Sequence, residues 1–171
     1  MRILAINYEY TLTGSTLILL RLAEHLREVG HEVSVCAAVP HDGPIKDSYR
    51  NRGFTVLEPP FPISTDVAIC NTVLTAPQLL ETAGSAKTVW WLHEGSLGLT
   101  HLLRNPNQIA AFAQASAVVF PIAHQRDWNS ALALRRGLVR WTLGAATAPR
   151  CLHKRPTLVA SAQASASNVP S

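Results

Sequence analysis

The chain has 171 residues, of which 47% are hydrophobic and 15% charged, and its formal net charge is +4. This composition excludes an intrinsically disordered protein, and without an apolar run of roughly 18 residues the chain has no candidate membrane-spanning segment. Residues 128–171 hold all of the basic excess, with six Lys or Arg and no Asp or Glu, so residues 1–127 do not form a nucleic-acid surface.

The first 37 residues predict a strand, a helix and a second, parallel strand. Residues 1–7 carry an apolar run flanked by polar residues, and residues 15–29 repeat Leu and Ala at the spacing of one helix face. Gly30 follows the helix, where a left-handed C-cap favours glycine, and residues 31–37 return to a strand pattern. The crossover of such a unit is right-handed in nearly all proteins.

The same alternation continues along the chain. Further strands are expected at residues 54–57, 66–71, 88–93 and 117–121, and helices at 45–51, 75–83, 105–115 and 126–133. Thr75 and Gln78 have the spacing of a capping box at the start of the helix at 75–83. The pattern predicts an α/β fold with a doubly wound, Rossmann-like parallel sheet in the strand order 3-2-1-4-5-6.

Three polar segments leave the carboxyl ends of the predicted strands. They are residues 7–15, Asn71-Thr72 and residues 93–96. Parallel sheets bind ligands at this edge, near the point where the strand order reverses. We therefore expect the loop that contains Gly14 and the strand end that contains His93 to meet there, and Asn71 and Thr72 to bind substrate.

Gly14 and Ser15 stand at the start of the first predicted helix. Free N–H groups and the helix dipole at such a position favour a phosphate or a carboxylate. The alternative is a tight turn closed by Ser15 as a cap. One glycine does not make the three-glycine dinucleotide fingerprint, so no nicotinamide or flavin cofactor is expected.

His93 and Glu94 follow a strand rich in large apolar residues. An imidazole there can donate to a sugar or phosphate oxygen, or move a proton at neutral pH. The alternative is a ring satisfied by a backbone carbonyl, beside a solvated Glu94. The other histidines and the three cysteines lack metal-ligand spacing, so no metal site is expected, and Cys36 and Cys70 are expected to be buried thiols.

Several of these segments resemble glycosyltransferases of the two-lobed GT-B fold. The resemblance rests on residues 1–7, the loop with Gly14 and Ser15, and residues 22–26 and 30–35. It continues, in the same order, at residues 66–71, 89–94, 118–121 and 125–126. Residues 1–130 are therefore similar to the N-terminal lobe of the large retaining group usually called group 1 or family 4.

The resemblance implies metal-independent transfer of a sugar from a nucleotide-sugar donor to a sugar or lipid acceptor. In that family the N-terminal lobe mainly binds the acceptor, and its first loop approaches the donor phosphates, a role that would fall on Gly14 and Ser15. The family's histidine at the end of the fifth strand contacts the donor sugar, which implies a catalytic role for His93 with Glu94 beside it. Hydrogen-bond donors aimed at the diphosphate would stabilise the charge on the leaving group.

The resemblance also implies a second lobe with a nucleotide pocket, and residues 128–171 cannot supply it because they hold no acidic residue. We expect residues 131–171 to be a disordered, basic, Ala/Ser-rich tail, outside a transferase domain at residues 1–130. One hypothesis is that a frameshift or an early stop truncated a longer gene, and the other is a natural basic tail. In both cases the catalytic cleft would have one wall.

This gap leaves three functions open. The first is the acceptor-binding lobe of a glycosyltransferase, inactive unless a separate C-terminal lobe completes it. The second is a non-catalytic α/β binding domain, and the third is another enzyme that binds a phosphorylated ligand at Gly14. Asn7, Glu9 and Arg21 interrupt any signal-peptide core, so we expect a cytoplasmic protein, in solution or peripheral to the membrane.

Overall fold

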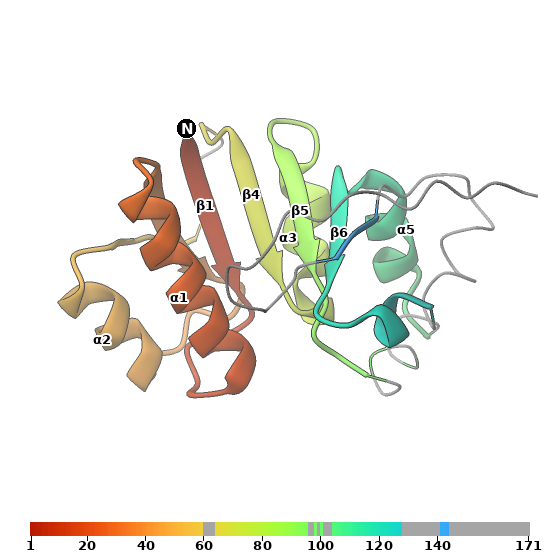
Figure 1. Cartoon of the computed structure of the whole chain (residues 1–171), viewed down its shortest axis with the longest axis horizontal. Coiled ribbons are helices and arrows are strands. Elements are labelled where there is room, and N and C mark those ends of the chain that lie inside the picture. Colours follow the sequence, from red (N-terminus) through yellow and green to blue (C-terminus); the bar gives the residue numbers. More distant parts are fainter. Residues whose placement is uncertain (60–63, 96–97, 99, 101–103, 128–140, 144–171) are drawn as a thin grey trace, which may run out of the picture.

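A parallel sheet of seven strands forms the centre of the molecule, in the order β3-β2-β1-β4-β5-β6-β7 (Figure 1). The computed structural model describes residues 1–59, 64–95, 98, 100, 104–127 and 141–143. The first six strands confirm the predicted doubly wound α/β fold and its strand order. The strands are β1 Arg2–Asn7, β2 Glu32–Ala37, β3 Thr55–Val56, β4 Val67–Asn71, β5 Lys87–Trp91, β6 Ala117–Phe120 and β7 Trp141–Leu143.

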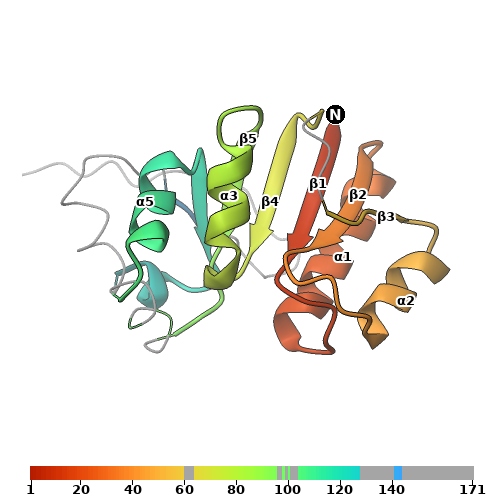
Figure 2. The same cartoon turned by 180° about the vertical axis from the view of Figure 1, so that it is seen from behind.

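Helices cover both faces of this sheet (Figures 1 and 2). Helices α1 (Gly14–Glu28) and α2 (Pro44–Asn51) lie on one face, and α3 (Ala76–Thr82) and α5 (Pro106–Gln114) lie on the other. A 3-10 turn, η1 (Val73–Thr75), leads into α3, and a helical turn at residues 123–127 begins earlier than predicted. None of the helices in the described part of the chain is long and apolar enough to cross a bilayer.

Strand β1 is buried on both of its faces, as a central strand of a parallel sheet should be. Ile3 and Ala5 belong to the hydrophobic cluster under α1 and α2, whereas Leu4 and Ile6 belong to the cluster under α3 and α5. None of these four side chains is more than 4% exposed. The apolar run at the start of the chain therefore serves two cores that share one strand.

Helix α1 has a defined beginning and a defined end. Thr13 is its N-cap: the Thr13 hydroxyl accepts from the Thr16 N–H at 3.4 Å, and the Thr16 hydroxyl accepts from the Thr13 N–H at 3.0 Å. This reciprocal pair is a capping box, so the cap is Thr13 and not Ser15 as in the alternative drawn from the sequence. At the other end Gly30 has a φ of 89°, the left-handed conformation that was predicted for it.

The start of α3 differs from its prediction, because the expected capping box between Thr75 and Gln78 does not form. The side chain of Thr75 makes no cap bond and donates instead to the Thr72 carbonyl oxygen at 2.9 Å. The physical reason is that η1 runs directly into α3, so the chain is already turning when it reaches Thr75. Sequence spacing alone does not reveal a preceding 3-10 turn.

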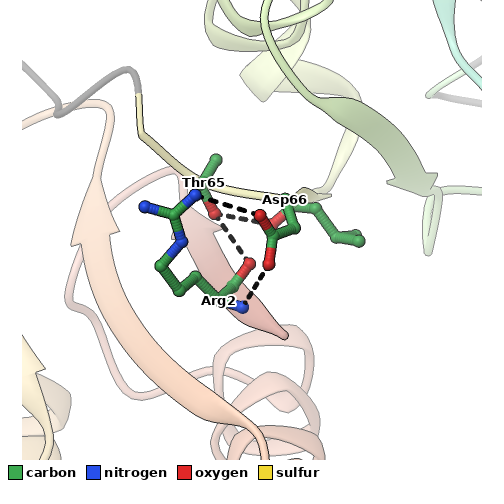
Figure 3. Close-up of polar contacts among 4 residues, drawn as sticks. Arg2, Thr65 and Asp66 are labelled. Atoms are coloured by element: carbon green, nitrogen blue, oxygen red, sulfur yellow. Dashed lines mark hydrogen bonds and ion pairs between the residues drawn. The ribbon is translucent and has the colours of Figure 1, made fainter.

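The amino ends of β1 and β4 are joined by side chains (Figure 3). Asp66 accepts from the Arg2 backbone N–H at 2.8 Å and from the Arg2 guanidinium at 3.1 Å. The Thr65 hydroxyl donates to the Arg2 carbonyl oxygen at 3.0 Å. The two bonds from Arg2, the backbone one first, lower the pKa of Asp66. Together with the Thr65 bond they join the amino ends of two paired strands whose other ends form the candidate site.

Strand β7 lies in the segment that was expected to be a disordered tail. Trp141–Leu143 pair in parallel with β6, and this differs from the expectation for residues 131–171. Without β7 the outer edge of β6 would present unpaired N–H and C=O groups, and three residues of extended backbone satisfy them whatever the charge of the segment. The rest of that segment lies outside the described residues, so the domain boundary at residue 130 stays a prediction.

The conformation of Gly30 yields a stability prediction. A Cβ at Gly30 meets no atom within 4 Å, but φ is 89° there, so we expect Gly30→Ala to lower the free energy of unfolding by about 1 kcal/mol. Gly84 also has open space around a built Cβ and has no positive φ, so Gly84→Ala is the matched control and should stay within about 0.5 kcal/mol of wild type. Urea titration measures both, and equal effects would contradict the account.

Candidate functional site

The carboxyl ends of β1, β4 and β5 come together at one edge of the sheet. β1 ends at Asn7, β4 ends at Asn71, and His93 follows two residues after the end of β5. Asn7 and Asn71 are both 0% exposed, although each carries a polar side chain. Buried amides of this kind must find hydrogen-bond partners, because an unsatisfied one costs about 1–3 kcal/mol.

The partners form a chain of side chains across the sheet. His93 Nε2 lies 2.8 Å from Asn71 Oδ1. Asn71 Nδ2 donates to Asn7 Oδ1 at 3.2 Å and to the Ser15 carbonyl oxygen at 3.1 Å. Asn7 Nδ2 donates to the hydroxyl of Tyr49 at 3.3 Å. The structure thus links His93 to the first turn of α1, where Gly14 and Ser15 stand.

The His93 imidazole is uncharged at neutral pH. Burial lowers its pKa to about 4, well below the ordinary value for histidine. The ring also packs against Trp91, with ring centroids 4.7 Å apart, and the His93 carbonyl oxygen accepts from Gln125 Nε2 at 3.0 Å. An uncharged ring can exchange hydrogen bonds with a hydroxyl, but it brings no positive charge to a phosphate.

Glu94 is neither free nor simply solvated. Its Oε1 accepts from the Val73 N–H at 2.8 Å, and its Oε2 accepts from the His93 N–H at 3.0 Å. The carboxylate therefore ties the segment after β4 to the segment after β5. Gly98 packs so closely on Glu94 that a Cβ at position 98 would overlap the Glu94 Cβ, which explains a glycine at that position.

Thr72 has a strained backbone. Its φ of 79° and ψ of 162° lie in a region that is nearly exclusive to glycine, and among the described residues no other non-glycine residue has a positive φ. The conformation is held from both sides. The Thr72 N–H donates to the Trp91 carbonyl oxygen at 2.8 Å, and the Thr72 carbonyl oxygen accepts from Trp90 Nε1 at 2.8 Å. Strain that is held in this way gathers at functional sites.

A cleft of about 180 Å³ opens between these strand ends and the loop that leads into α1. Three of the predicted site residues line it, namely Ser15, Thr72 and Glu94. Its other lining residues are Tyr8, Glu9, Thr11, Thr13, Thr16 and Leu74. A larger cavity, of about 290 Å³, lies at the opposite edge beside Arg2 and Thr65, where parallel sheets do not usually bind ligands.

The other three predicted site residues are placed differently. Asn71 is buried and acts through its hydrogen bonds, and His93 contacts Asn71 without lining this cleft. Gly14 is the first residue of α1, and a Cβ built on it meets nothing within 4 Å. Among the described residues, no group of three or more His, Cys, Asp or Glu side chains could hold a metal ion.

The loop at residues 8–13 belongs to the polar segment 7–15 that was expected at this edge, and it supplies cleft residues that were not individually predicted. Helix α2 holds this loop in place. Tyr10 is 2% exposed, and its carbonyl oxygen accepts from the Ile45 N–H at 3.3 Å. Gly43 packs on the same carbonyl so tightly that a Cβ at position 43 would overlap the oxygen. The signal in the sequence was the polar character of this segment, between the first predicted strand and the first predicted helix.

The comparisons with known proteins point to one family. A family described as "Glycosyl-transferase family 4" matches the chain over residues 1–119. This range covers β1 to β5, most of β6, and every residue that forms the strand-end cleft. No curated protein and no solved structure matches the chain.

The lowered pKa of His93 predicts an acid-sensitive fold. Between about pH 6.5 and pH 4 the unfolded chain binds a proton at His93 that the folded chain does not, so stability falls as the pH falls through this range. We expect His93 to account for a loss of about 1–3 kcal/mol. Urea titrations from pH 7 to pH 4 measure it, and His93→Gln should flatten the pH dependence of the free energy of unfolding. Parallel curves for wild type and His93→Gln would refute the assignment.

The strain at Thr72 predicts a stabilising substitution. Thr72→Gly removes the Cβ that makes a φ of 79° unfavourable, so we expect the free energy of unfolding to rise by about 1 kcal/mol after the entropy cost of glycine. Thr88→Gly, in β5 and without a positive φ, should lower it instead. Chemical denaturation compares the two, and a Thr72→Gly variant less stable than wild type would show that the backbone there is not strained.

Proposed function

Because the chain belongs to glycosyl-transferase family 4, we propose that its strand-end cleft takes part in the transfer of a sugar from a nucleotide-sugar donor to an acceptor. The observation that carries this proposal is the chemistry of the cleft lining. Six of its lining residues bear hydroxyl groups, which can donate and accept hydrogen bonds, namely Tyr8, Thr11, Thr13, Ser15, Thr16 and Thr72. Such a surface matches a ligand that is itself covered with hydroxyl groups.

The charges of the cleft favour the acceptor over the donor diphosphate. Glu9 and Glu94 line it, and no Lys, Arg or His stands among the described residues that do. A diphosphate would meet two like charges there, whereas carboxylates accept hydrogen bonds from sugar hydroxyls. We therefore assign the cleft to the sugar portion of an acceptor.

The donor is proposed to approach the neighbouring start of α1. The N–H groups of a helix's first turn have no partners within the helix, and the dipole there favours an anion, so Gly14 and Ser15 are the candidate contacts for a donor phosphate. The open space around Gly14 would let a ligand approach the backbone closely. The uncharged His93 suits a hydroxyl of the donor sugar better than its phosphates.

A second set of groups is needed to balance the charge of the leaving diphosphate. Basic side chains or a metal ion usually stabilise such a charge, and the described cleft lining has no basic side chain. We propose that a further lobe or a partner chain supplies them, and that the described residues alone bind without catalysing transfer. We also propose that the transferred sugar keeps its anomeric configuration, and this part of the proposal is supported by the family alone.

Binding measurements test this division of roles. We expect the purified chain to bind one or more members of a panel of mono- and disaccharides and soluble glycolipid headgroups, and to release no product from nucleotide sugars. Isothermal titration calorimetry measures the binding, and a coupled assay for free nucleotide measures any turnover of the nucleotide sugars. Turnover of a nucleotide sugar by the chain alone would overturn the claim that groups from elsewhere are required, and binding of nucleotide but no sugar would favour a different phosphate-binding protein.

A cleft variant sharpens the same experiment. For any sugar that binds, Ser15→Ala should weaken binding about 3- to 10-fold through the loss of one hydrogen bond, with little change in stability. Ser48→Ala is the matched control: Ser48 is also a helical serine, on α2, and its hydroxyl donates to the Pro44 carbonyl oxygen away from the cleft. An equal effect of the two substitutions would remove the cleft from the proposal.

A further inference from the structure

The side-chain amide of Asn71 fits its surroundings in one of its two orientations. The Ser15 carbonyl oxygen lies 3.1 Å from one end of this amide, and a carbonyl oxygen can only accept a hydrogen bond. The amide nitrogen must therefore face Ser15, and it also donates to Asn7 Oδ1 at 3.2 Å. The Asn71 oxygen is left facing His93 Nε2 at 2.8 Å.

This orientation determines where His93 carries its proton. A carboxamide oxygen can only accept, so the bond at 2.8 Å requires a hydrogen on Nε2. A neutral imidazole has one N–H, and burial keeps this ring neutral at pH 7. The other nitrogen, Nδ1, must then present a lone pair.

We propose that Asn71 is a positioning residue that holds His93 in the Nε2–H tautomer and so makes Nδ1 a hydrogen-bond acceptor. Within the described part of the chain the structure shows no hydrogen bond to Nδ1. The group that meets Nδ1 must be a donor, such as a hydroxyl of a bound sugar, and not an ionised phosphate oxygen. This last step rests on the proposed function, whereas the tautomer does not.

The surroundings of Asn71 make its hold on the ring rigid. Asn71 is 0% exposed, its two amide hydrogens have separate acceptors on α1 and β1, and its oxygen faces the imidazole. The indole of Trp91 packs against the His93 ring at 4.7 Å between centroids and restricts its rotation. Contacts from α1, β1 and β5 thereby keep the ring proton on Nε2 and leave Nδ1 as a hydrogen-bond acceptor.

Nuclear magnetic resonance of the full-length, ¹⁵N-labelled chain at pH 7 tests the proposal without any ligand. The His93 signals are identified by their loss in His93→Gln. We expect a one-bond correlation from a protonated Nε2 that exchanges slowly with water, and a long-range signal from Nδ1 at the shift of an unprotonated nitrogen.

Two substitutions at Asn71 separate positioning from a general structural role. Asn71→Ala removes the acceptor, so the one-bond Nε2–H signal should be lost to exchange and to a mixture of tautomers. Asn71→Asp keeps oxygens opposite Nε2, so the signal should persist even though the bonds to Ser15 and Asn7 are gone. Asn51→Ala, at an exposed asparagine at the end of α2, is the control and should leave the spectrum of His93 unchanged.

A proton on Nδ1 in the wild-type chain would overturn the proposal, as would an Nε2–H signal that survives in Asn71→Ala. If Asn71→Ala does not fold, the wild-type spectrum still decides, because an amide nitrogen that faced His93 would require an unprotonated Nε2. These spectra do not depend on whether a sugar binds. Failure of the proposed function and failure of this inference are therefore distinguishable.

Discussion

The buried amide of Asn71 is the interaction on which the strand-end edge depends. It ties β4 to β1 through Asn7, to α1 through the Ser15 carbonyl oxygen, and to the segment after β5 through His93. Each group left unpaired at such depth would cost about 1–3 kcal/mol, so these elements can shift only together. The bond from Asn71 to the Ser15 carbonyl oxygen helps to hold the first turn of α1 against the ends of the strands.

A second constraint is electrostatic. The edge combines an uncharged imidazole, two carboxylates and a row of hydroxyl groups, while the helix start beside it carries the positive end of a dipole. A neutral polyol and an anionic group can therefore lie close together there on different partners. Under the proposed function an acceptor would bind hydroxyl side chains of the cleft, while a donor phosphate would bind backbone N–H groups at the start of α1.

Much of this architecture could be predicted from the sequence, for physical reasons that differ between elements. The strands at β1, β4 and β5 were visible because strands covered on both faces are apolar throughout, and Gly30 was visible because only glycine tolerates its φ. The meeting of the strand ends followed from topology. The hydrogen bond between His93 and Asn71 could not be predicted in the same way. It depends on the register between β4 and β5, which the amino-acid composition does not determine.

Other features were out of reach for local reasons. The failed cap at Thr75 depends on a turn that precedes it, the strain at Thr72 depends on bonds to Trp90 and Trp91, and β7 depends on an open sheet edge.

The position of the amino end of β1 has a practical consequence. Met1 and Arg2 sit at the edge opposite the cleft, separated from it by the full length of a six-residue strand. A surface coupled to the N-terminus would therefore present the cleft to solution, which suits immobilised binding formats.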